Sequence, residues 1–364
     1  MLEFFSLMGH RFNAFLTPLT LLAGVGAFIL SILVTRWMIT INIHDTPGHR
    51  SSHSQITPRG GGMGIIVGFL LAMSIFFYQG ALSHISAWKL FILSTAIIGL
   101  SVVSFWDDLK TVPLRHKLIA QIGASFLIVG SGLSFESIPL PWGHVLYLGA
   151  FSGILSIFWV IYFTNTMNFM DGLDGLAAGT TLIASFFAIL IGLISEQKAF
   201  LYVSFSLFGS TLGFFLYNRA PARIFMGDVG SQFLGFLWAV LLLLTTDSDH
   251  TPLSFYTIPL LFFSFLYDVG LTILCRLFKR QSIWKPHRTF LFHLLHRSGH
   301  SHGSISLIYM FFAIIQGIGA LFMQYISPHY QILVFFPYFL MMGGYTLWVR
   351  HQTLRVIHRD TPLV

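Results

Sequence analysis

The segment TNTMNFMDGLDGLAAG, residues 164–179, separates two long apolar runs and carries four polar side chains within ten residues: Asn165, Asn168, Asp171 and Asp174. The two asparagines are three residues apart, as are the two aspartates, so each pair shares a face where the segment is helical. Gly172 and Gly175 oppose a continuous helix and let backbone N–H groups approach a ligand closely. One Asp-Gly dipeptide is typical of a turn. Two of them behind two asparagines indicate a site whose hard oxygen ligands suit Mg²⁺.

The composition indicates an integral membrane protein. Of the 364 residues, 55% are hydrophobic and 9% are charged, and the mean hydropathy is +0.77, whereas a soluble domain carries about 25% charged residues. The first apolar run continues to residue 40 without a small-residue cleavage site, so we interpret it as a retained helix rather than a signal peptide. Cys275 is the one cysteine, which excludes an intrachain disulfide.

Eleven apolar runs are long enough to be membrane spans, since a spanning helix needs roughly 20 mostly apolar residues. Short polar loops separate them, and the chain shows neither an internal repeat nor a soluble domain. The sequence therefore predicts one all-α transmembrane domain, residues 1–364, built as a bundle of about eleven helices. The predicted spans are 15–40, 61–80, 88–106, 116–134, 144–164, 176–194, 199–217, 230–246, 253–278, 303–326 and 329–349.

Lys and Arg are distributed unevenly between the two sets of loops that eleven spans create. One set holds 17 of the 20, and the other holds only Arg11, Lys89 and Lys198. Because loops rich in Lys and Arg remain on the cytoplasmic side, we expect the N-terminus outside and the C-terminus in the cytoplasm. The acidic clusters described next also fall on or near the cytoplasmic side.

Two further acidic clusters flank predicted spans. Asp107 and Asp108 end the third span in FWDDLK, where adjacent carboxylates repel and each unpaired charge beside hydrocarbon is costly. Asp228 precedes the eighth span in RIFMGDVGSQFLGF. Taken singly, the pair fits a solvated helix end, and Asp228 fits a helix cap. Three acidic clusters on one face favour a shared site for a divalent cation.

Basic residues on the same face are candidate ligands for phosphate groups. They lie in residues 44–62, in LRHK (114–117) and in residues 277–302. The positive-inside bias alone explains any one of them. The histidines of 277–302 match no compact zinc spacing and no cysteine joins them, which argues against zinc.

A glycine-rich segment and a single aspartate lie inside predicted spans. GGGMG (60–64) lacks the strand–helix context of a nucleotide-binding loop, whereas Gly60, Gly64 and Gly68 have the spacing of closely packed membrane helices. Asp268 lies within the ninth span, where an acid is a functional candidate by default. It could equally pair with Arg276 or with a neighbouring helix.

Together these clusters indicate phosphoryl transfer at the inner membrane face. Such chemistry depends mainly on positioning and on neutralising charge, and the membrane-embedded body implies that the second substrate is a lipid. A transporter or lipid flippase would explain the spans and Asp268, but would more naturally place its polar groups near the midplane. A structural scaffold explains none of the polar clusters.

Three motifs in this order resemble the polyprenyl-phosphate N-acetylhexosamine-1-phosphate transferases, the membrane family of the WecA-like enzymes and the MraY translocase. Asp107 and Asp108 match the paired aspartates of the family. Residues 165–179 match its Asn-x-x-Asn-x-x-Asp-Gly-x-Asp-Gly block, and FMGDVGS (225–231) matches its Met-Gly-Asp block. The resemblance covers nearly the whole chain and implies a multi-helix bundle with a cytoplasmic active-site cleft.

The resemblance implies transfer of an N-acetylhexosamine 1-phosphate from a UDP-sugar to undecaprenyl phosphate, with release of UMP and with Mg²⁺ bridging the diphosphate. By this resemblance Asp228 and Asn168 hold the metal, and Asp107 or Asp108 orients or deprotonates the lipid phosphate. The substrate contacts that it implies are Asn165, Asp171, Asp174, Lys117, His287, Arg288 and His293.

The last large basic loop departs from the family pattern. The family commonly has a His-x-His-His or triple-His element there, whereas HRTFLFHLLH (287–296) keeps His293 and has Phe290 and Phe292 in place of two histidines. The start, HRT, resembles the His-Arg-Ser-His form of O-antigen-initiating members. This disfavours the alternative of a UDP-MurNAc-pentapeptide phosphotransferase of peptidoglycan synthesis.

The resemblance therefore implies an enzyme of the bacterial inner membrane that starts a lipid-linked surface glycan of the O-antigen type in lipopolysaccharide biosynthesis. GlcNAc, QuiNAc and FucNAc all remain open as the sugar. The expected partners are the UDP-N-acetylhexosamine, undecaprenyl phosphate, membrane lipid and a second copy of the chain in a homodimer. Nucleic acid is not an expected partner.

Overall fold

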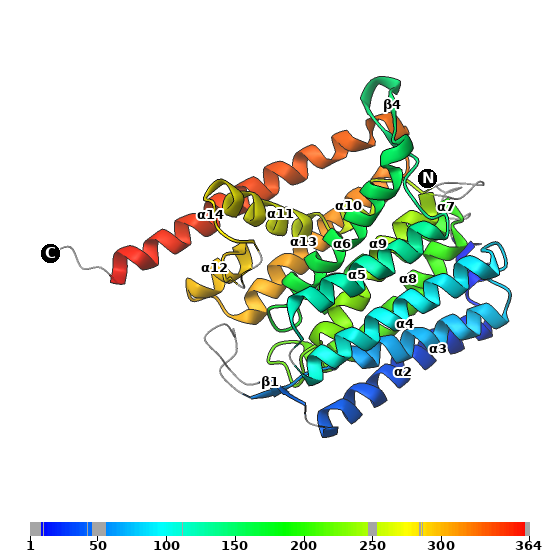
Figure 1. Cartoon of the computed structure of the whole chain (residues 1–364), viewed down its shortest axis with the longest axis horizontal. Coiled ribbons are helices and arrows are strands. Elements are labelled where there is room, and N and C mark those ends of the chain that lie inside the picture. The colour runs from blue at the N-terminus through cyan, green and yellow to red at the C-terminus, as the bar shows by residue number, and fades with distance from the viewer. Residues whose placement is uncertain are drawn as a thin grey trace.

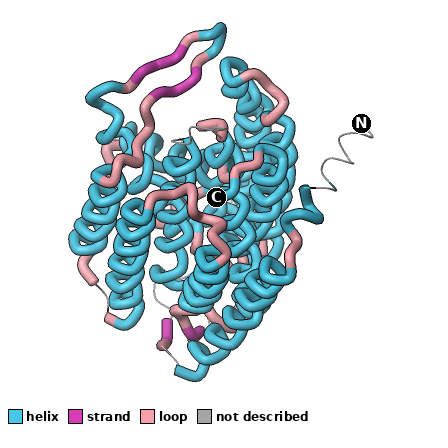
Figure 2. Tube along the Cα trace, turned by 90° about the vertical axis from the view of Figure 1, so that its right-hand side faces the viewer, coloured by secondary structure: helices cyan, strands magenta, loops and turns pink. Residues whose placement is uncertain are grey.

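The computed structural model describes residues 9, 11–41, 43–45, 56–110, 112–246, 253–283, 285 and 287–360. These residues form a helical bundle with two short antiparallel strand pairs at opposite ends (Figures 1 and 2). The prediction of an all-α polytopic membrane protein is confirmed. The elements are α2 (Pro18–Ile41), β1 (His44–Asp45), β2 (Thr57–Pro58), α3 (Gly62–Tyr78), α4 (Ala87–Leu109), α5 (Leu114–Gly130), β3 (Ser137–Pro139), β4 (Val145–Tyr147), α6 (Ser152–Met170), α7 (Leu176–Ser195), α8 (Lys198–Asn218), α9 (Gly227–Thr246), α10 (Thr257–Leu261), α11 (Phe263–Phe278), α12 (Leu291–Arg297), α13 (His302–Met323) and α14 (Phe335–Asp360).

Eight helices in the described ranges are long and apolar enough to cross a membrane: α2, α4, α6, α7, α8, α9, α13 and α14. Helices α3 and α5 occupy the second and fourth predicted spans but have 17 residues each. The ninth predicted span is divided into α10 and α11. The exact number of eleven spans therefore stays a prediction.

Helix α9 lies at the centre of the bundle. Its apolar stretch is 89% buried within the protein, whereas those of α2 and α14 are 28% buried. It packs against α3, α4 and α6, and residues 233–244 are apolar or glycine on every face, as expected for a helix that neighbours surround. Because Asp228 is in the first turn of α9, the packing places this carboxylate in the middle of one end of the bundle.

Two predicted spans differ from the helices observed. The span 144–164 was placed too early, because Val145–Tyr147 is strand β4 and pairs with β3, Ile138 opposite Leu146. Helix α6 begins at Ser152 and continues to Met170. An apolar run alone does not distinguish a strand from a helix.

The span 253–278 is interrupted at Phe262, whose φ of −115° and ψ of 22° leave the helical region. The ring of Phe262 is fully buried between Trp238 and Phe163, with centroid separations of 5.1 and 5.3 Å. The helix is thus interrupted at the residue whose ring packs against these two aromatic side chains. An apolar run predicts an unbroken helix, because it carries no information about which rings will pack against it in the folded protein.

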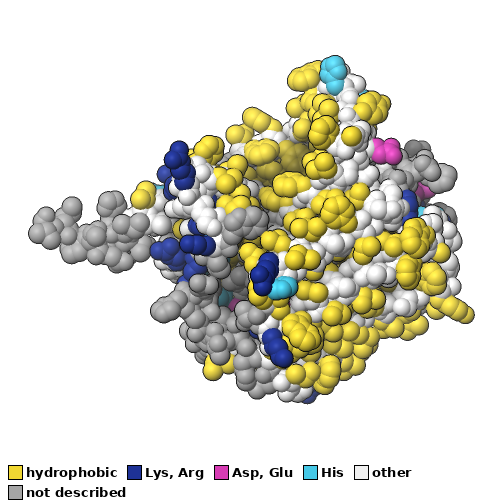
Figure 3. Space-filling view, in the orientation of Figure 1, with side chains coloured by type: hydrophobic (Ala, Val, Ile, Leu, Met, Phe, Trp, Pro, Cys, Tyr) yellow, Lys and Arg dark blue, Asp and Glu magenta, His cyan; other side chains and the backbone are white. Residues whose placement is uncertain are grey.

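Lys and Arg side chains gather toward one end of the molecule. In Figure 3 most of those visible lie on the left, toward the end where α12 and β1 lie in Figure 1, and hydrophobic side chains cover much of the remaining surface. This clustering agrees with the two sets of loops inferred from the sequence. The membrane side that each end faces stays a prediction.

Glycines of α3 allow close helix packing, as their spacing predicts. A Cβ atom at Gly64 would lie 2.7 Å from the Ser31 carbonyl oxygen of α2, and one at Gly68 would lie 2.5 Å from the Ala27 carbonyl oxygen. Gly60 does not take part, because it precedes the helix with a φ of +88°. The prediction is correct for the second and third glycines and wrong for the first.

Replacing Gly64 with leucine should lower the thermal unfolding temperature in detergent, because the side chain would force α2 and α3 apart. Overpacking of this kind typically costs about 1–3 kcal/mol. Gly99→Leu is the matched control, since a Cβ atom at Gly99 has no neighbour within 4 Å. Equal unfolding temperatures for the two variants would contradict the packing interpretation.

Candidate active site

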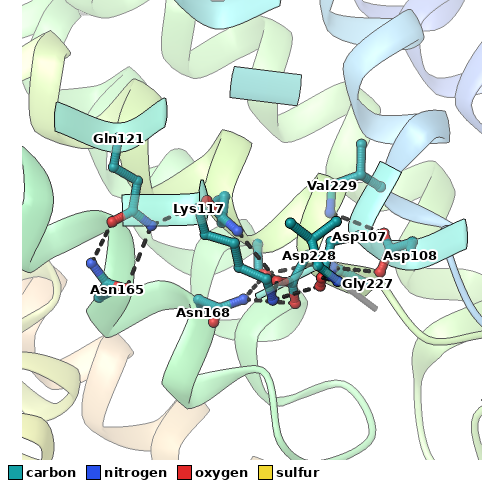
Figure 4. Close-up of polar contacts among 12 residues, drawn as sticks. Asp107, Asp108, Lys117, Gln121, Asn165, Asn168, Gly227, Asp228 and Val229 are labelled. Carbon is teal, nitrogen blue, oxygen red and sulfur yellow. Dashed lines mark hydrogen bonds and ion pairs between the residues drawn. The ribbon is translucent and has the colours of Figure 1, made fainter. Parts of the chain in front are cut away.

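Three helix ends bring Asp107, Lys117 and Asp228 together (Figure 4). Asp107 lies near the end of α4, Lys117 in the first turns of α5 and Asp228 in the first turn of α9. The Lys117 Nζ atom is 2.5 Å from Asp107 Oδ2 and 2.6 Å from Asp228 Oδ2. One ammonium group thus neutralises carboxylates from two of the three motifs, which are remote from each other in the chain.

The two neighbouring aspartates of α4 have different surroundings. Asp108 is 1% exposed, and its carboxylate accepts hydrogen bonds from the backbone N–H groups of Asp228 and Val229, at 3.0 and 3.1 Å. It therefore holds the N-terminus of α9. Gly227 has a φ of +77°, and a Cβ atom there would lie 2.5 Å from Asp108 Oδ2, so this contact requires glycine.

Asp107 is the member of the pair that faces Lys117. Its other oxygen, Oδ1, accepts a hydrogen bond from the backbone N–H of Val112 at 2.6 Å, which fixes the carboxylate. Of the two predicted catalytic aspartates, Asp107 is thus placed beside the cation. Asp108 is placed to support α9.

Asn168 lies beside Asp228, as the motifs predict, and its amide orientation is defined by two donated hydrogen bonds. Its Nδ2 atom donates to Asp228 Oδ1 at 3.1 Å and to Ser231 Oγ at 2.9 Å. The Ser231 hydroxyl in turn donates to the Gly227 carbonyl oxygen, so it can accept from the amide. The Asn168 nitrogen, rather than its oxygen, therefore faces Asp228.

The carboxylates of the cluster meet the needs of a magnesium ion only together with a substrate. Among the described residues, no group of three His, Cys, Asp or Glu side chains could enclose a metal ion. Mg²⁺ commonly takes one or two carboxylates and completes its shell with water and substrate phosphate oxygens. The Oδ2 atoms of Asp107 and Asp228 converge on one cationic group and fit that pattern. Asn168 would join them only after its amide turns over.

Asn165 is hydrogen-bonded to Gln121 and to its own helix. Its Nδ2 atom donates to Gln121 Oε1 at 2.7 Å and to the Ile161 carbonyl oxygen at 2.8 Å. Gln121 also contacts Gln232, which donates to Asp228 at 3.2 Å. The two glutamines were missed from the sequence, although an amide inside an apolar span could have identified each of them.

The aspartates of the loop between α6 and α7 serve different contacts. Asp174 accepts a hydrogen bond from the Ala222 N–H at 3.1 Å and lies 3.0 Å from His302 Nδ1, so it connects this loop to α13. Asp171 follows the last residue of α6. Burial raises the pKa of Asp171 well above its usual value, and the charges of Asp228, Asp108 and Asp174 raise it further.

The buried Asp268 of α11 orders the last basic loop. Its carboxylate accepts hydrogen bonds from the Leu291 N–H at 2.7 Å, the Phe292 N–H at 3.4 Å and the Tyr309 hydroxyl at 2.6 Å. The first two donors are the start of α12. The prediction that Asp268 pairs with a neighbouring helix is therefore correct, and its partners lie in α12 and α13.

His293 is held in α12 directly against the loop of the long motif. Its ring packs on Phe292 at a centroid separation of 4.0 Å, and a Cβ atom at Gly172 would lie 3.5 Å from His293 Nε2. Burial, together with the positive charge of Arg288, lowers the pKa of His293 to about 3. At neutral pH this imidazole is uncharged, so it can exchange hydrogen bonds with a substrate but cannot supply positive charge.

His287 and Arg288 precede α12 on the same loop. His287 Nδ1 lies 2.9 Å from the Thr289 hydroxyl, and burial lowers the pKa of this histidine, with the Arg276 charge as a second cause. Arg288 is the permanent cation of the three predicted residues. Of the predicted basic stretch 44–62, residues 46–55 lie outside the described residues.

Comparison with known proteins shows the family of this chain. Residues 90–246 match the family model described as glycosyl transferase family 4. A probable undecaprenyl-phosphate N-acetylglucosaminyl 1-phosphate transferase of Bacillus subtilis is 30% identical over 87% of this chain and 90% of its own length. Phospho-N-acetylmuramoyl-pentapeptide-transferases of Streptococcus thermophilus and Enterococcus hirae are 29% and 39% identical, over 61% and 42% of this chain and 71% and 50% of their own lengths.

The protein is a polytopic helical bundle with a lysine between two carboxylates at one end. Together with its similarity to these relatives, this defines a membrane-embedded sugar-phosphate transferase. The chain belongs to glycosyl transferase family 4, among the polyprenyl-phosphate sugar-1-phosphate transferases. The resemblance drawn from the three motifs is confirmed.

Replacing Asp268 with alanine should lower the thermal unfolding temperature and speed tryptic cleavage between Lys279 and Arg288, because the buried donors at the start of α12 lose their acceptor. A buried donor without an acceptor costs about 1–3 kcal/mol. Tyr309→Phe, which removes one donor and leaves the other contacts, is the control and should have the smaller effect. Wild-type cleavage and unfolding by the alanine variant would contradict this role of Asp268.

Proposed function

We propose that this chain transfers an N-acetylhexosamine 1-phosphate from a UDP-sugar to undecaprenyl phosphate and releases UMP. The observation that carries the proposal is the convergence of Asp107, Lys117 and Asp228 from three separate helices, α4, α5 and α9, at one end of the bundle. The name of the Bacillus subtilis relative supports the acceptor lipid and makes UDP-GlcNAc the first donor to test. The predominance of Lys and Arg in one set of loops supports a site that faces the cytoplasm. The bacterial inner membrane is the location that we propose with it.

In the proposed reaction an oxygen of the lipid phosphate forms a bond to the β-phosphorus of the UDP-sugar. The bond from that phosphorus to the oxygen bridging the two phosphates breaks, and UMP leaves with this oxygen. A phosphate monoester has its second pKa near 6, so much of the acceptor is already dianionic at pH 7. Asp107 therefore serves to orient the acceptor more than to deprotonate it.

Lys117 and Asp228 provide the charge that this reaction needs. In the structure Lys117 neutralises the two carboxylates, and it becomes a phosphate ligand when the negative substrate arrives. Asp228, Asp107 and, after its amide turns, Asn168 would hold Mg²⁺, which when bound supplies positive charge against the diphosphate oxygens. The remaining predicted residues would then surround or support the nucleotide-sugar site: Asp171, Asp174, Asn165, His287, Arg288 and His293.

The further proposal that the product starts an O-antigen type of surface glycan depends on the basic loop. The start of HRTFLFHLLH, which resembles the His-Arg-Ser-His form of O-antigen-initiating members, supports it. The identity to phospho-N-acetylmuramoyl-pentapeptide-transferases, 39% over 162 residues for the Enterococcus hirae protein, favours a second candidate, transfer from UDP-MurNAc-pentapeptide. Both candidates use the same acceptor and release UMP.

Purified protein should release UMP when it is incubated with undecaprenyl phosphate, Mg²⁺ and the correct donor. The donor panel contains UDP-GlcNAc, UDP-QuiNAc, UDP-FucNAc and UDP-MurNAc-pentapeptide. Release that depends on both lipid and Mg²⁺ with one donor would establish the reaction and identify the sugar. Absence of UMP with every donor, from protein that unfolds cooperatively, would reject this set of substrates and favour transport without chemistry.

Asp228→Asn and Asn168→Ala should each lower the rate of UMP release by more than about 100-fold, the scale for loss of a group that stabilises charge in a transition state. Both proteins should remain folded in the membrane. Glu196→Gln is the matched control, because Glu196 is exposed and contacts Arg11 outside the cluster. Near-normal release by both site variants at limiting Mg²⁺ would reject the metal assignment.

A further inference from the structure

Three amide side chains form a chain of hydrogen bonds that ends on Asp228. We propose that Gln232, supported by Gln121 and Asn165, is a positioning residue that aims the Asp228 carboxylate for metal and substrate binding. This inference rests on the proposed function and gives Asn165 a supporting role in place of direct substrate contact. The three residues come from α9, α5 and α6 (Figure 4 shows Gln121 and Asn165).

The direction of the hydrogen bonds is fixed at both ends. The Asn165 Nδ2 atom donates to the Ile161 carbonyl oxygen, which can only accept, and to Gln121 Oε1. Gln121 must then use its nitrogen toward the next amide, and its Nε2 atom lies 3.1 Å from Gln232 Oε1. This leaves Gln232 Nε2 to donate to Asp228 Oδ2 at 3.2 Å. The chain thus begins at a carbonyl oxygen, which can only accept, and ends at a carboxylate, which also accepts. These two ends orient all three amides so that an N–H group of Gln232 points to Asp228.

The burial of the two glutamines makes the arrangement rigid. Gln121 and Gln232 are 3% and 2% exposed, since Gln121 lies on the buried face of α5 and Gln232 lies in the central helix α9. An amide that rotated there would lose its hydrogen bonds without replacement by water. The chain of amides consequently resists inversion, which would turn an oxygen toward the Asp228 carboxylate.

Gln232 differs from Lys117 and Asn168 because it lies on the same helix as Asp228. It lies on α9 four residues after Asp228, deeper in the bundle. Lys117 and Asn168 are the groups expected to exchange contacts when the diphosphate and the metal arrive. The bond from Gln232 remains during that exchange and keeps the carboxylate oriented.

The competing explanation is that the amides only connect α5, α6 and α9, as interhelical hydrogen bonds do in other membrane proteins. Such a role would affect unfolding temperature and leave the metal and donor requirements of the folded protein unchanged. A positioning role instead changes metal affinity at equal folding. A structural role therefore changes the unfolding temperature alone, whereas a positioning role changes the metal affinity of the folded protein.

The test compares Gln232→Met, which removes the donor, with Gln232→Glu, which replaces it by an acceptor of the same shape. Mn²⁺ binding is followed by electron paramagnetic resonance, and UMP release is followed as a function of Mg²⁺. We expect Gln232→Met to weaken Mn²⁺ binding and raise the half-maximal Mg²⁺ concentration by about 10–100-fold, the usual effect of losing a residue that orients a metal ligand. Gln232→Glu should weaken Mn²⁺ binding more than Gln232→Met does. Gln121→Met should weaken it less, because Gln121 acts on Asp228 only through Gln232.

Gln316→Met is the matched control. Gln316 is also fully buried, in α13, but its amide donates to the Leu261 carbonyl oxygen and accepts from the Ser264 N–H, outside the cluster. It should lower the unfolding temperature and leave Mn²⁺ binding unchanged. All variants are compared at temperatures where each is folded.

The outcomes separate this inference from the proposed function. Active wild-type protein with unchanged Mn²⁺ binding and Mg²⁺ dependence in both Gln232 variants would overturn the inference alone. A wild-type protein that neither binds Mn²⁺ nor releases UMP would overturn both. A selective loss of metal binding in the Gln232 variants, absent in Gln316→Met, would support the positioning role.

Discussion

The contact of Lys117 with Asp107 and Asp228 is the interaction on which the arrangement of this protein depends. Carboxylates at the end of an apolar bundle are close to hydrocarbon, where an unpaired charge is costly. One ammonium group between two carboxylates relieves their repulsion and connects α4, α5 and α9. It also leaves more negative than positive charge in the contact itself, because one ammonium group faces two carboxylates. That imbalance suits a site that takes up a divalent cation together with a phosphate substrate.

Two buried carboxylates also hold the starts of helices. Asp108 accepts N–H groups at the start of α9, and Asp268 accepts those at the start of α12. In both cases a carboxylate from one helix satisfies the donors of another, which a helix start buried inside the protein requires. The first contact positions the central metal-binding candidate Asp228, and the second positions His293 against the long motif. Buried carboxylates thus set the relative positions of the groups that are proposed to bind substrate.

Much of the site was predictable because its residues lie in compact motifs. The paired aspartates, the Met-Gly-Asp segment and Lys117 each indicated charge chemistry, and the uneven distribution of Lys and Arg placed them on one face. The contacts of each residue were not predictable. Asn165 was expected beside the substrate but bonds to Gln121, and His293 was grouped with cations although burial keeps it neutral. These outcomes depend on neighbours that are remote in the sequence.

The sequence by itself determined that the chain is a helical membrane protein and that its polar motifs gather at helix ends, because apolar length and charge placement are local properties. Tertiary structure alone decided which of two adjacent aspartates meets Lys117 and which supports α9, where α6 begins, and how the buried glutamines point. The physical reason is that hydrogen-bond partners and burial arise from packing between helices. A carboxylate or an amide has no defined role until its donors, its acceptors and its access to water are in place.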